Sequence, residues 1–512
     1  MLEYIAMGFQ QVVTVENILF CFICTVFGIA IGAMPGLGPT IGMTLLIPLT
    51  FGMNPTTALL GLAACYCATQ YGGSITAILI KTPGTGAAAC TTFDGHAMTL
   101  QGRAGEALDE ACVASFWGGI LSVVALLLVA PPLAKFSLMF SAQEYFAVSL
   151  FGLTIIAALC GKNVWKGLIV GAFGMLLGCV GIDPFNGLPR YTFGMYQLES
   201  GLNTLAVMTG MFSINRMFKL AATVNKDAEK KAAAVTNKHH LVKDLFRYPV
   251  TYLRSALIGI VIGIMPAAGA NIATFIAYGQ GKRFCKEGKS FGTGSREGVA
   301  CCEASNNGVT GGALVPTLTL GIPGSPPMAI FLSAMMVHGL TPGYELFSAR
   351  ASTVYPFMVG LFIANIFMLL VGYYTARYFA VVTKVPNSML AAAVVIACVT
   401  GIFAASNMMF NTYLLLLFGV VGYFMEKYDF SVVPLVLGML LGPLTEKGML
   451  QGLALTRGAI PFVMSLFTRP ISLFFMVCTI ASLVSGIRTM RKESKEIISE
   501  EESNDLMLRG NK

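Results

Sequence analysis

The chain has 512 residues, of which 55% are hydrophobic and 11% charged, and its formal net charge is +8. A soluble domain has about 25% charged residues, so this composition excludes one. The basic residues fall between apolar runs and near the C-terminus, as membrane insertion requires, and the positive charge therefore does not indicate nucleic-acid binding.

Apolar runs that could form membrane-crossing helices recur along the chain. A helix needs roughly 20 apolar residues to cross a bilayer. With their uncharged neighbours, such runs lie near residues 18–34, 114–129, 145–160, 164–180, 202–218, 354–374, 390–403, 412–425, 432–441, 448–466 and 471–485. The sequence therefore predicts an all-α polytopic membrane protein with roughly 12 spans.

Neither the N-terminus nor the reactive side chains indicate a secreted protein or an enzyme. The first sixteen residues carry two Glu and no Lys or Arg, unlike a cleavable signal peptide, so we expect the first apolar run to be retained as a span. The thirteen Cys are scattered, and the CxxC of Cys21 and Cys24 lies in an apolar run, which favours helix packing. Four His and no HExxH or GxSxG motif leave no basis for a catalytic site. No cofactor is expected.

One apolar motif that ends in a break occurs twice. Residues 28–38 read GIAIGAMPGLG and residues 259–269 read GIVIGIMPAAG, with seven of eleven positions identical. Pro and Gly interrupt each run at its end, and a broken membrane helix is tolerated only where protein or a water-filled cavity satisfies its backbone groups. Two breaks in corresponding places predict a binding site made by both halves of the chain.

A second landmark follows each break. Gly72-Gly73 corresponds to Gly311-Gly312, and Pro83-Gly84 corresponds to Pro323-Gly324 after a one-residue shift. The Gly pairs and the Pro-Gly dipeptides bracket apolar segments that are too short to span a membrane alone, so we predict that these segments form re-entrant hairpins. The order of the landmarks indicates an internal duplication. The Gly residues could equally serve close helix packing.

The loop charges predict that the two copies are inverted. The basic stretch between Arg216 and Arg254 is the clearest cytoplasmic loop. The loop at 281–298 contains five Lys and Arg residues, whereas its counterpart at 50–57 contains no charge. Equivalent loops on opposite faces are typical of inverted-topology repeats. The N-terminus is then periplasmic and the charged C-terminal tail cytoplasmic.

These patterns divide the chain into four parts. We predict a first transmembrane repeat at 1–220, a cytoplasmic linker at 221–250, a second repeat with the C-terminal spans at 251–487, and a charged cytoplasmic tail at 488–512.

Polar and small residues gather at the predicted breaks. The N-terminus of a half-helix suits a carboxylate, whereas unwound carbonyls and amide or hydroxyl oxygens suit a small hard cation. We predict ion binding at Asn306, Asn307 and Thr310. We predict substrate binding at Pro35, Gly36, Gly38, Thr40, Gly72, Gly73, Ser74, Lys81, Pro83, Gly84, Pro266, Gly269, Asn271, Gly311, Gly312, Pro323, Gly324 and Ser325.

Several charged residues near these breaks allow more than one interpretation. Lys81 could reach to the membrane interface, pair with a carboxylate or meet an anionic substrate. Glu297 and Glu303 could take part in ion coupling or balance nearby Lys and Arg. We expect Asp94 to cap a helix or to pair with Arg103. Single Ser and Thr residues in membrane helices often bond to the preceding turn instead of a ligand.

Four blocks resemble the large membrane subunit of the tripartite tricarboxylate transporters, the TctA family. They are PGLGPTIGMTLLIPLTFGMNPTTAL, YGGSITAILIKTPGTGAAACTTFDGHAM, EGVACCEASNNGVTGGALVPTLTLGIPGS and GLTPGYELF, which lie within residues 20–350. The resemblance implies a secondary transporter that imports carboxylates, with a small four-helix membrane subunit and a periplasmic binding protein as partners. Lys81 departs from the family pattern, which has Asn there.

These observations together predict an ion-driven importer of di- or tricarboxylates such as citrate, in the bacterial inner membrane. Sodium is the expected coupling ion and a proton the alternative. A channel and a non-transporting scaffold subunit remain alternative functions.

Overall fold

The structure is a computed structural model that describes residues 2–34, 36–50, 52–159, 164–183, 185–222, 240–265, 269–379, 387–488 and 490. Helices account for most of these residues. Those long and apolar enough to cross a membrane lie at Val15–Gly32, Ala104–Met139, Ala351–Ala376, Met409–Lys427, Val433–Thr456 and Pro470–Arg488. Shorter apolar helices lie at Gly38–Thr50, Val164–Gly178, Pro249–Ile264, Pro326–Val337, Ala391–Ala404 and Ala459–Thr468. The prediction of an all-α, multi-pass membrane protein is confirmed, while the number of spans stays a prediction.

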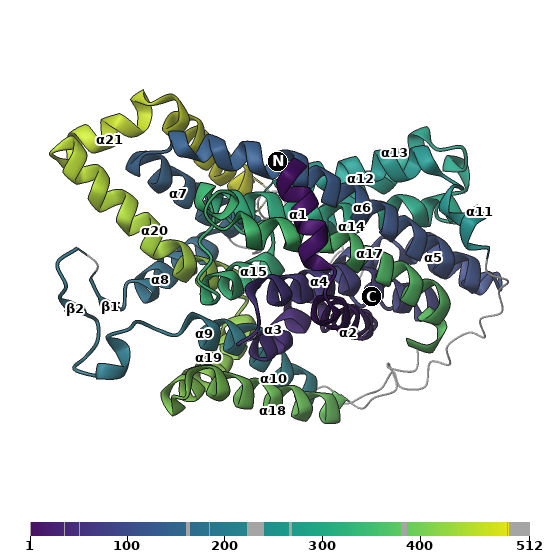
Figure 1. Ribbon diagram of the computed structural model, residues 1–512, viewed down its shortest axis with the longest axis horizontal. Coiled ribbons are helices and arrows are strands. Elements are labelled where there is room, and N and C mark those ends of the chain that lie inside the picture. The colour runs from purple at the N-terminus through teal and green to yellow at the C-terminus, as the bar shows by residue number, and fades with distance from the viewer. Residues whose placement is uncertain are drawn as a thin grey trace, which may run out of the picture. The chain divides into compact units, whose positions relative to one another are not determined.

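The chain forms two compact units, which are described separately. The first unit consists of Met1–Leu138 and Leu205–Tyr423. Its elements in order are α1 (Leu2–Val12), α2 (Val15–Gly32), α3 (Gly38–Thr50), α4 (Pro55–Ile80), η1 (Gly86–Ala89), α5 (Thr92–Leu100), α6 (Ala104–Phe136), α9 (Thr204–Thr209), the π-helical turn η4 (Gly210–Ile214), α10 (Asn215–Ala222), α11 (Leu241–Leu245), α12 (Pro249–Ile264), α13 (Gly269–Phe284), η5 (Gly288–Ser290), α14 (Arg296–Leu320), α15 (Pro326–Val337), α16 (Tyr344–Phe347), α17 (Ala351–Phe379), α18 (Asn387–Ser406) and most of α19 (Met409–Lys427) (Figure 1).

The second unit consists of Met139–Thr204 and Phe424–Lys512. It contains α7 (Ala142–Leu159), α8 (Val164–Gly178), the antiparallel pair β1 (Gly181–Ile182) and β2 (Pro189–Arg190), α20 (Val433–Thr456), α21 (Ala459–Thr468) and the helix Pro470–Arg488. Helices α8 and α20 pack closely, because a Cβ on Gly174 would overlap the carbonyl oxygen of Leu435 and one on Gly438 would overlap that of Gly171. Small residues allow membrane helices to approach in this way.

Each compact unit takes segments from both predicted repeats, because the units follow packing and the repeats follow sequence. The boundaries predicted at 1–220, 221–250, 251–487 and 488–512 therefore stay predictions. Residues 223–239 of the predicted linker and 491–512 of the predicted tail lie outside the described residues.

The duplicated sequence forms duplicated elements in the first unit. Helices α2, α3 and α4 correspond to α12, α13 and α14 in order, and α2 packs on α4 as α12 packs on α14. Each long helix begins with a side-chain cap, since Asn54 accepts from Thr56 N–H at the start of α4 and Ser295 accepts from Gly298 N–H at the start of α14. The same local chemistry thus starts both long helices.

The corresponding helices also make reciprocal contacts between the halves. Helix α6 of the first half packs on α14, and α17 of the second half packs on α4. Helix α3 packs on α15, and α13 packs on η1. In each pair, one element comes from each half of the sequence. The halves therefore interlock.

Two sequence expectations about helix boundaries are wrong. Helix α4 runs without interruption through Gly72-Gly73, and α14 runs through Gly311-Gly312, so the Gly pairs do not mark the start of separate segments. The apolar runs at 432–441 and 448–466 are not two separate helices, because α20 continues through Pro443 to Thr456 and only then gives way to α21. Helix α1, which packs on α17, was not predicted.

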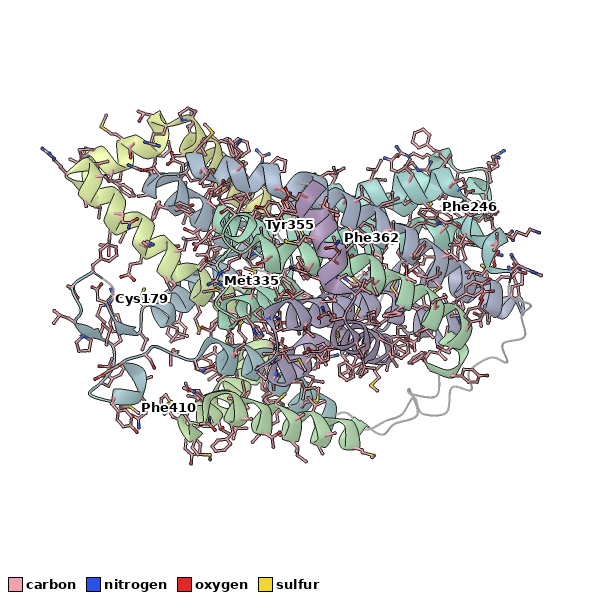
Figure 2. All side chains as sticks on the ribbon, in the orientation of Figure 1. Cys179, Phe246, Met335, Tyr355, Phe362 and Phe410 are labelled. Carbon is pink, nitrogen blue, oxygen red and sulfur yellow. The ribbon has the colours of Figure 1, made fainter. Side chains whose placement is uncertain are left out.

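Side-chain burial is consistent with helices that face lipid on the outside. Met335 and Tyr355 lie in the interior of the first unit, with 0% and 3% of their surface exposed, whereas Phe246 is 65% exposed (Figure 2). Large apolar side chains are also exposed along the apolar helices, for example Leu128 on α6 and Leu417 on α19. Such a surface is expected where the surrounding medium is hydrocarbon.

Candidate functional site

The two long central helices, α4 and α14, end in the same backbone motif. Lys81 follows α4 with φ 57°, and Gly321 follows α14 with φ 69°, both in the left-handed region. The N–H of each residue donates to a carbonyl in the last turns of its helix, that of Thr76 or of Pro316. Glycine adopts this conformation freely, but a residue with a Cβ is strained by about 1 kcal/mol. Only the first copy carries this strain.

A Pro-Gly turn follows each of these helix ends. Each turn packs closely against the helix of its own half that ends at the duplicated motif, which is α2 in the first half and α12 in the second. A Cβ on Gly84 would overlap the carbonyl oxygen of Gly32, and the Gly84 N–H donates to the Gly73 oxygen over 3.0 Å. In the second copy a Cβ on Gly324 would lie 3.1 Å from the Gly263 oxygen. We refer to residues 82–86 and 321–325 as the turn pair.

Each turn also reaches residues of the other half. A Cβ on Gly86 would lie 2.9 Å from the side chain of Asn271, which stands in the first turn of α13. Ser325 lies beside Tyr66 of α4. Each turn therefore contacts a residue of the other half that lies more than 180 positions away in the sequence.

Two of the three hydroxyl groups in the turn pair are left without partners, whereas that of Thr82 donates to the Ile80 carbonyl over 3.3 Å. The oxygens of Thr85 and Ser325 are shut off from solvent, and neither has a hydrogen-bond partner of ordinary geometry. Buried polar atoms in folded proteins are rarely unpartnered, so such atoms point to a missing ligand or water.

The Gly pairs have a packing role that the sequence left open. A Cβ on Gly72 would overlap the Ile29 oxygen, and one on Gly312 would lie 2.6 Å from the Ile260 oxygen. The Gly311 N–H lies inside α14 and donates to Ser122 Oγ over 3.2 Å. Ligand binding by these residues stays a prediction, but backbone N–H groups inside a continuous helix are not free to hold a carboxylate.

The remaining predicted residues are only partly described. Pro35 and Pro266 lie outside the described residues. Gly36, at φ 87°, accepts a hydrogen bond on its carbonyl oxygen from Arg216 Nε over 2.9 Å. Gly38 and Gly269 both have φ 65° and begin α3 and α13. Thr40 accepts at its carbonyl from Thr44 Oγ1, the back-bonding expected of a threonine in a membrane helix.

The three predicted ion-binding residues lie along α14 at its contact with α4. Asn306 Nδ2 donates to the Gln70 carbonyl over 3.1 Å, and Asn307 Nδ2 donates to the Cys67 carbonyl over 3.2 Å. Thr310 Oγ1 donates to the Asn307 carbonyl over 2.6 Å. The amide oxygens of both Asn residues are buried and have no partner.

Glu303 lies one turn before Asn306 and is fully buried. Its Oε1 accepts a hydrogen bond from Thr91, which follows residues 82–86 of the turn pair in the chain. Its Oε2 accepts from Ser115 Oγ of α6 over 3.1 Å. Among the described residues no Lys, Arg or His forms an ion pair with Glu303 or Glu297; the latter accepts from Thr251 instead. Neither carboxylate therefore forms a direct ion pair with a described basic residue, and both interpretations of these two residues stay predictions.

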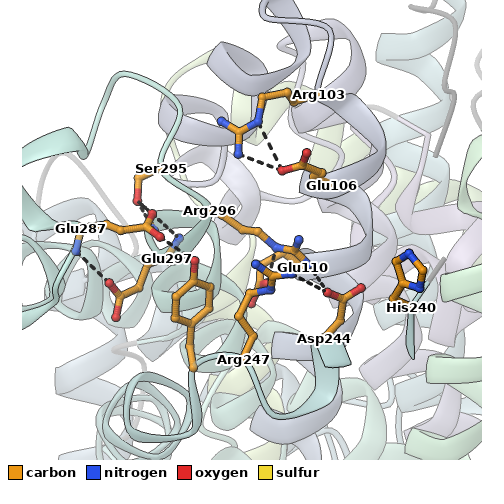
Figure 3. Close-up of polar contacts among 12 residues, drawn as sticks. Arg103, Glu106, Glu110, His240, Asp244, Arg247, Glu287, Ser295, Arg296 and Glu297 are labelled. Carbon is orange, nitrogen blue, oxygen red and sulfur yellow. Dashed lines mark hydrogen bonds and ion pairs between the residues drawn. The ribbon is translucent and has the colours of Figure 1, made fainter. Parts of the chain in front are cut away.

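A buried ionic cluster lies at the start of α14 (Figure 3). Arg296 Nε bonds to Glu110 Oε2 over 2.7 Å, and Arg296 Nη2 bonds to Asp244 Oδ1 over 2.8 Å. Burial would raise the pKa of Asp244, but a hydrogen bond from Tyr373 and the charges of Arg296 and Arg247 hold that pKa below its ordinary value. Through these bonds the cluster links α11, which precedes the predicted second repeat, to α6, α14 and α17.

Asp94 does not pair with Arg103. Its Oδ1 accepts from the N–H groups of Gly292, Gly294 and Ser295 at 2.8–2.9 Å, while Arg103 pairs with Glu106. Asp94 therefore holds the loop that leads into α14, so a first-half carboxylate orders a second-half loop.

Lys81 lines an open cavity of about 480 Å³. The cavity also exposes Lys282 and His96 and is walled by Phe93, Tyr278 and Phe291, so it combines two ammonium groups with apolar surface. Of the three interpretations of Lys81, pairing with a described carboxylate is not seen. An anionic ligand and a position at the membrane interface both fit this placement.

Sequence reasoning missed Thr91, Ser115 and Tyr66, because hydroxyl groups in apolar segments usually bond to their own helix. It also missed Arg216, which follows the π-helical turn η4. Such turns are frequent at functional sites, but no sequence pattern announces them.

The sequence pattern of the family described as "Tripartite tricarboxylate transporter TctA family" matches residues 18–437. The chain belongs to the TctA family. Membership makes it a component of a tripartite tricarboxylate transporter and confirms the resemblance found in its motif blocks.

Two relatives of the TctA protein come from Agrobacterium vitis. One is described as an uncharacterized 52.8 kDa protein in the TAR-I ttuC' 3' region; it is 32% identical over 492 residues, which cover 96% of this chain and 98% of the relative. The other, an uncharacterized protein in the TAR-II ttuC' 3' region, is 30% identical over 236 residues, which cover 46% of this chain and 98% of the relative. No solved structure matches the chain.

Proposed function

We propose that this TctA protein is the transporting subunit of an ion-driven importer of di- or tricarboxylates such as citrate. The observation that carries the proposal is the turn pair, because each of its two turns contacts an element of the other half inside one compact unit. Substrate sites of secondary transporters are built from interrupted helices of two structural repeats.

The carboxylates of the substrate would bind at the turn pair. The buried hydroxyls of Thr85 and Ser325 and the amide of Asn271 are the uncharged donors available there. The Lys81 cavity would receive the anion on one side of the site, because two Lys side chains attract negative charge.

Sodium is the proposed coupling ion, with a proton as the alternative. The buried, unpartnered amide oxygens of Asn306 and Asn307 support a cation, because hard cations prefer oxygen ligands. The reciprocal contacts between the halves support inverted repeats, and alternating access would then move one set of elements against the other.

The protein would act in the bacterial inner membrane together with two partners of the tripartite system. A small four-helix membrane subunit would form the membrane complex, and a periplasmic binding protein would deliver the substrate. The N-terminus would be periplasmic and the C-terminus cytoplasmic, as the basic loops require. No enzymatic activity is part of the proposal.

Uptake by proteoliposomes tests this function. The complete complex is reconstituted with and without binding protein, and accumulation of labelled citrate and dicarboxylates is followed under a sodium gradient, a proton gradient or neither. We expect saturable accumulation that requires the binding protein and an inward sodium gradient. Uptake that never exceeds equilibration would instead indicate a channel.

Two variants test the turn pair itself. Thr85→Ala and Ser325→Ala should each raise the substrate concentration for half-maximal uptake by about tenfold or more, since a hydrogen bond to a charged carboxylate is worth about 1.5–3 kcal/mol and about 1.4 kcal/mol is a factor of ten. Ser348→Ala, which removes an exposed hydroxyl, is the control. Loss of uptake by Asn306→Ala in a complex that assembles normally would disfavour the scaffold function.

A further inference from the structure

The side chain of Glu303 is a carboxylate buried in a membrane protein without a counter-charge. It is 0% exposed, and no basic side chain in the described part of the chain pairs with it. An ionised carboxylate in such a place is costly unless a cation compensates it. Ionisable groups of this kind within membrane segments generally mark ion pathways or binding sites.

Four separate segments supply polar groups around this carboxylate. Thr91 and Ser115 donate hydrogen bonds to its two oxygens, and Asn306 Nδ2 lies 3.4 Å from Oε2. The Ser74 hydroxyl of α4 also faces the carboxylate. Both halves of the chain therefore contribute to one group of polar side chains around Glu303, which we call the chamber.

Two oxygens at this chamber lack partners. Ser74 Oγ is fully buried and makes no hydrogen bond of ordinary geometry, and Asn306 Oδ1 is likewise buried and unpartnered. Asn306 Nδ2 already donates to the Gln70 carbonyl, which sets the orientation of the amide. Carboxylate, hydroxyl and amide oxygens are the ligands that hard cations prefer.

We propose that Glu303 and Ser74, with Thr91 and Asn306, bind one sodium ion. A single carboxylate balances a single positive charge, so a monovalent cation leaves the chamber neutral. Among the described residues no group of three or more His, Cys, Asp and Glu side chains could hold a metal ion, and this leaves transition metals without a site of their usual kind. The proposal names the charged ligand behind the sodium coupling proposed above and rests on that function for its role in transport.

The chamber adjoins the first turn of the turn pair. A Cβ on Gly73, next to Ser74, would lie 2.7 Å from the Thr85 backbone nitrogen, and Thr91 follows the same turn within six residues. A cation held by Ser74 and Thr91 orders the two ends of the segment between these residues, which contains residues 82–86 of the turn pair. Ion binding thereby prepares the Thr85 hydroxyl for the substrate.

Sodium binding to the purified full-length protein in lipid nanodiscs tests the proposal without substrate. Binding of ²²Na⁺ is measured for the wild type, Glu303→Gln and Ser74→Ala, with Glu106→Gln as the control because Glu106 is 40% exposed and pairs with Arg103. We expect saturable binding by the wild type and the control, no measurable binding by Glu303→Gln, and a dissociation constant raised about 10- to 100-fold in Ser74→Ala.

Thermal unfolding in sodium and in choline separates binding from folding. Sodium should raise the midpoint of the wild type and leave that of Glu303→Gln unchanged, because only a protein that binds the ion is stabilised by it. In choline, Glu303→Gln should be at least as stable as the wild type, since it removes an uncompensated buried charge.

The outcomes distinguish this inference from the proposed function. Unchanged ²²Na⁺ binding in Glu303→Gln and Ser74→Ala overturns the assignment of the site, even if uptake depends on sodium. Absence of ²²Na⁺ binding by the wild type also overturns it, and points to proton coupling if uptake follows a proton gradient. Sodium-independent uptake by a wild type that binds sodium at Glu303 would contradict the proposed coupling and leave the site intact.

Discussion

Helices α4 and α14 share one geometry and differ in chemistry. Both begin at a side-chain cap, pack on a broken helix through a Gly pair, and end in a left-handed residue before a Pro-Gly turn. Within Pro55–Ile80 there is no charged residue, whereas Arg296–Leu320 contains Arg296, Glu297 and Glu303. The duplicated backbone is thus retained, while of the two helices only α14 contains charged side chains.

The first copy has its charge at the helix end instead. Lys81 occupies the left-handed position that Gly321 fills in the second copy. Strained positions that persist in a structure are often functional, because the local cost must be offset elsewhere. The comparison supports the proposed cation binding in the body of α14 and the proposed anion binding at the end of α4, and three pairs of substitutions test it.

The largest effect is expected from Arg296→Ala. The change leaves the buried carboxylate of Glu110 without an ion-pair partner and Asp244 with Arg247 alone, which should cost about 3–5 kcal/mol of stability. The thermal midpoint of the purified protein measures this loss. Arg103→Ala, which breaks the half-exposed pair with Glu106, should cost less than about 1 kcal/mol. Equal losses in the two variants would show that the cluster does not stabilise α14.

A smaller effect on stability is expected from alanine substitutions in the two Pro-Gly turns, and it should differ between the turns. The added methyl of Gly84→Ala would overlap the Gly32 oxygen, so we expect a loss of about 1–3 kcal/mol and a strong fall in uptake. In Gly324→Ala the methyl would stand 3.1 Å from the Gly263 oxygen, and a slight shift can absorb it. Paired measurements of the thermal midpoint and of uptake check the difference. Similar losses would mean that the turns are equally tight.

The smallest effect concerns the helix ends. Lys81→Gly should stabilise the protein by about 1 kcal/mol, because glycine accepts φ 57° without strain, and should weaken substrate uptake. Gly321→Ala, at φ 69°, should destabilise it by a similar amount. Opposite shifts of the thermal midpoint are the expected result. Full uptake by Lys81→Gly at limiting substrate would remove Lys81 from the site.

Much of the fold follows from local patterns in the sequence. The paired Pro and Gly landmarks predict the duplication, and the apolar runs predict a multi-pass helical protein, because both signals are local. The Gly pairs misled the prediction, since glycine fits a break and a close helix contact equally well. In the structure the Gly pairs contact Ile29 and Ile260, so they serve close helix packing and do not break the helices.

The site was less accessible to sequence reasoning. Glu303 stands out only once Thr91 and Ser115 are placed around it, and they are 212 and 188 positions away in the chain. A lone Glu in a loop-like sequence near Lys and Arg residues resembles ordinary charge balance. Its lack of an ion pair with any described Lys, Arg or His is a property of the packing.

The reciprocal contacts between the halves also constrain the order of assembly in the membrane. The carbonyls of Gln70 and Cys67 receive Asn306 and Asn307, residues 236 and 240 positions later in the chain. A chain made from the N-terminus therefore inserts α4 long before its partners on α14 exist. Until then α4 lacks the Asn side chains that donate to it in the folded protein. A nascent chain stalled before residue 296 should consequently be the form most exposed to membrane proteases.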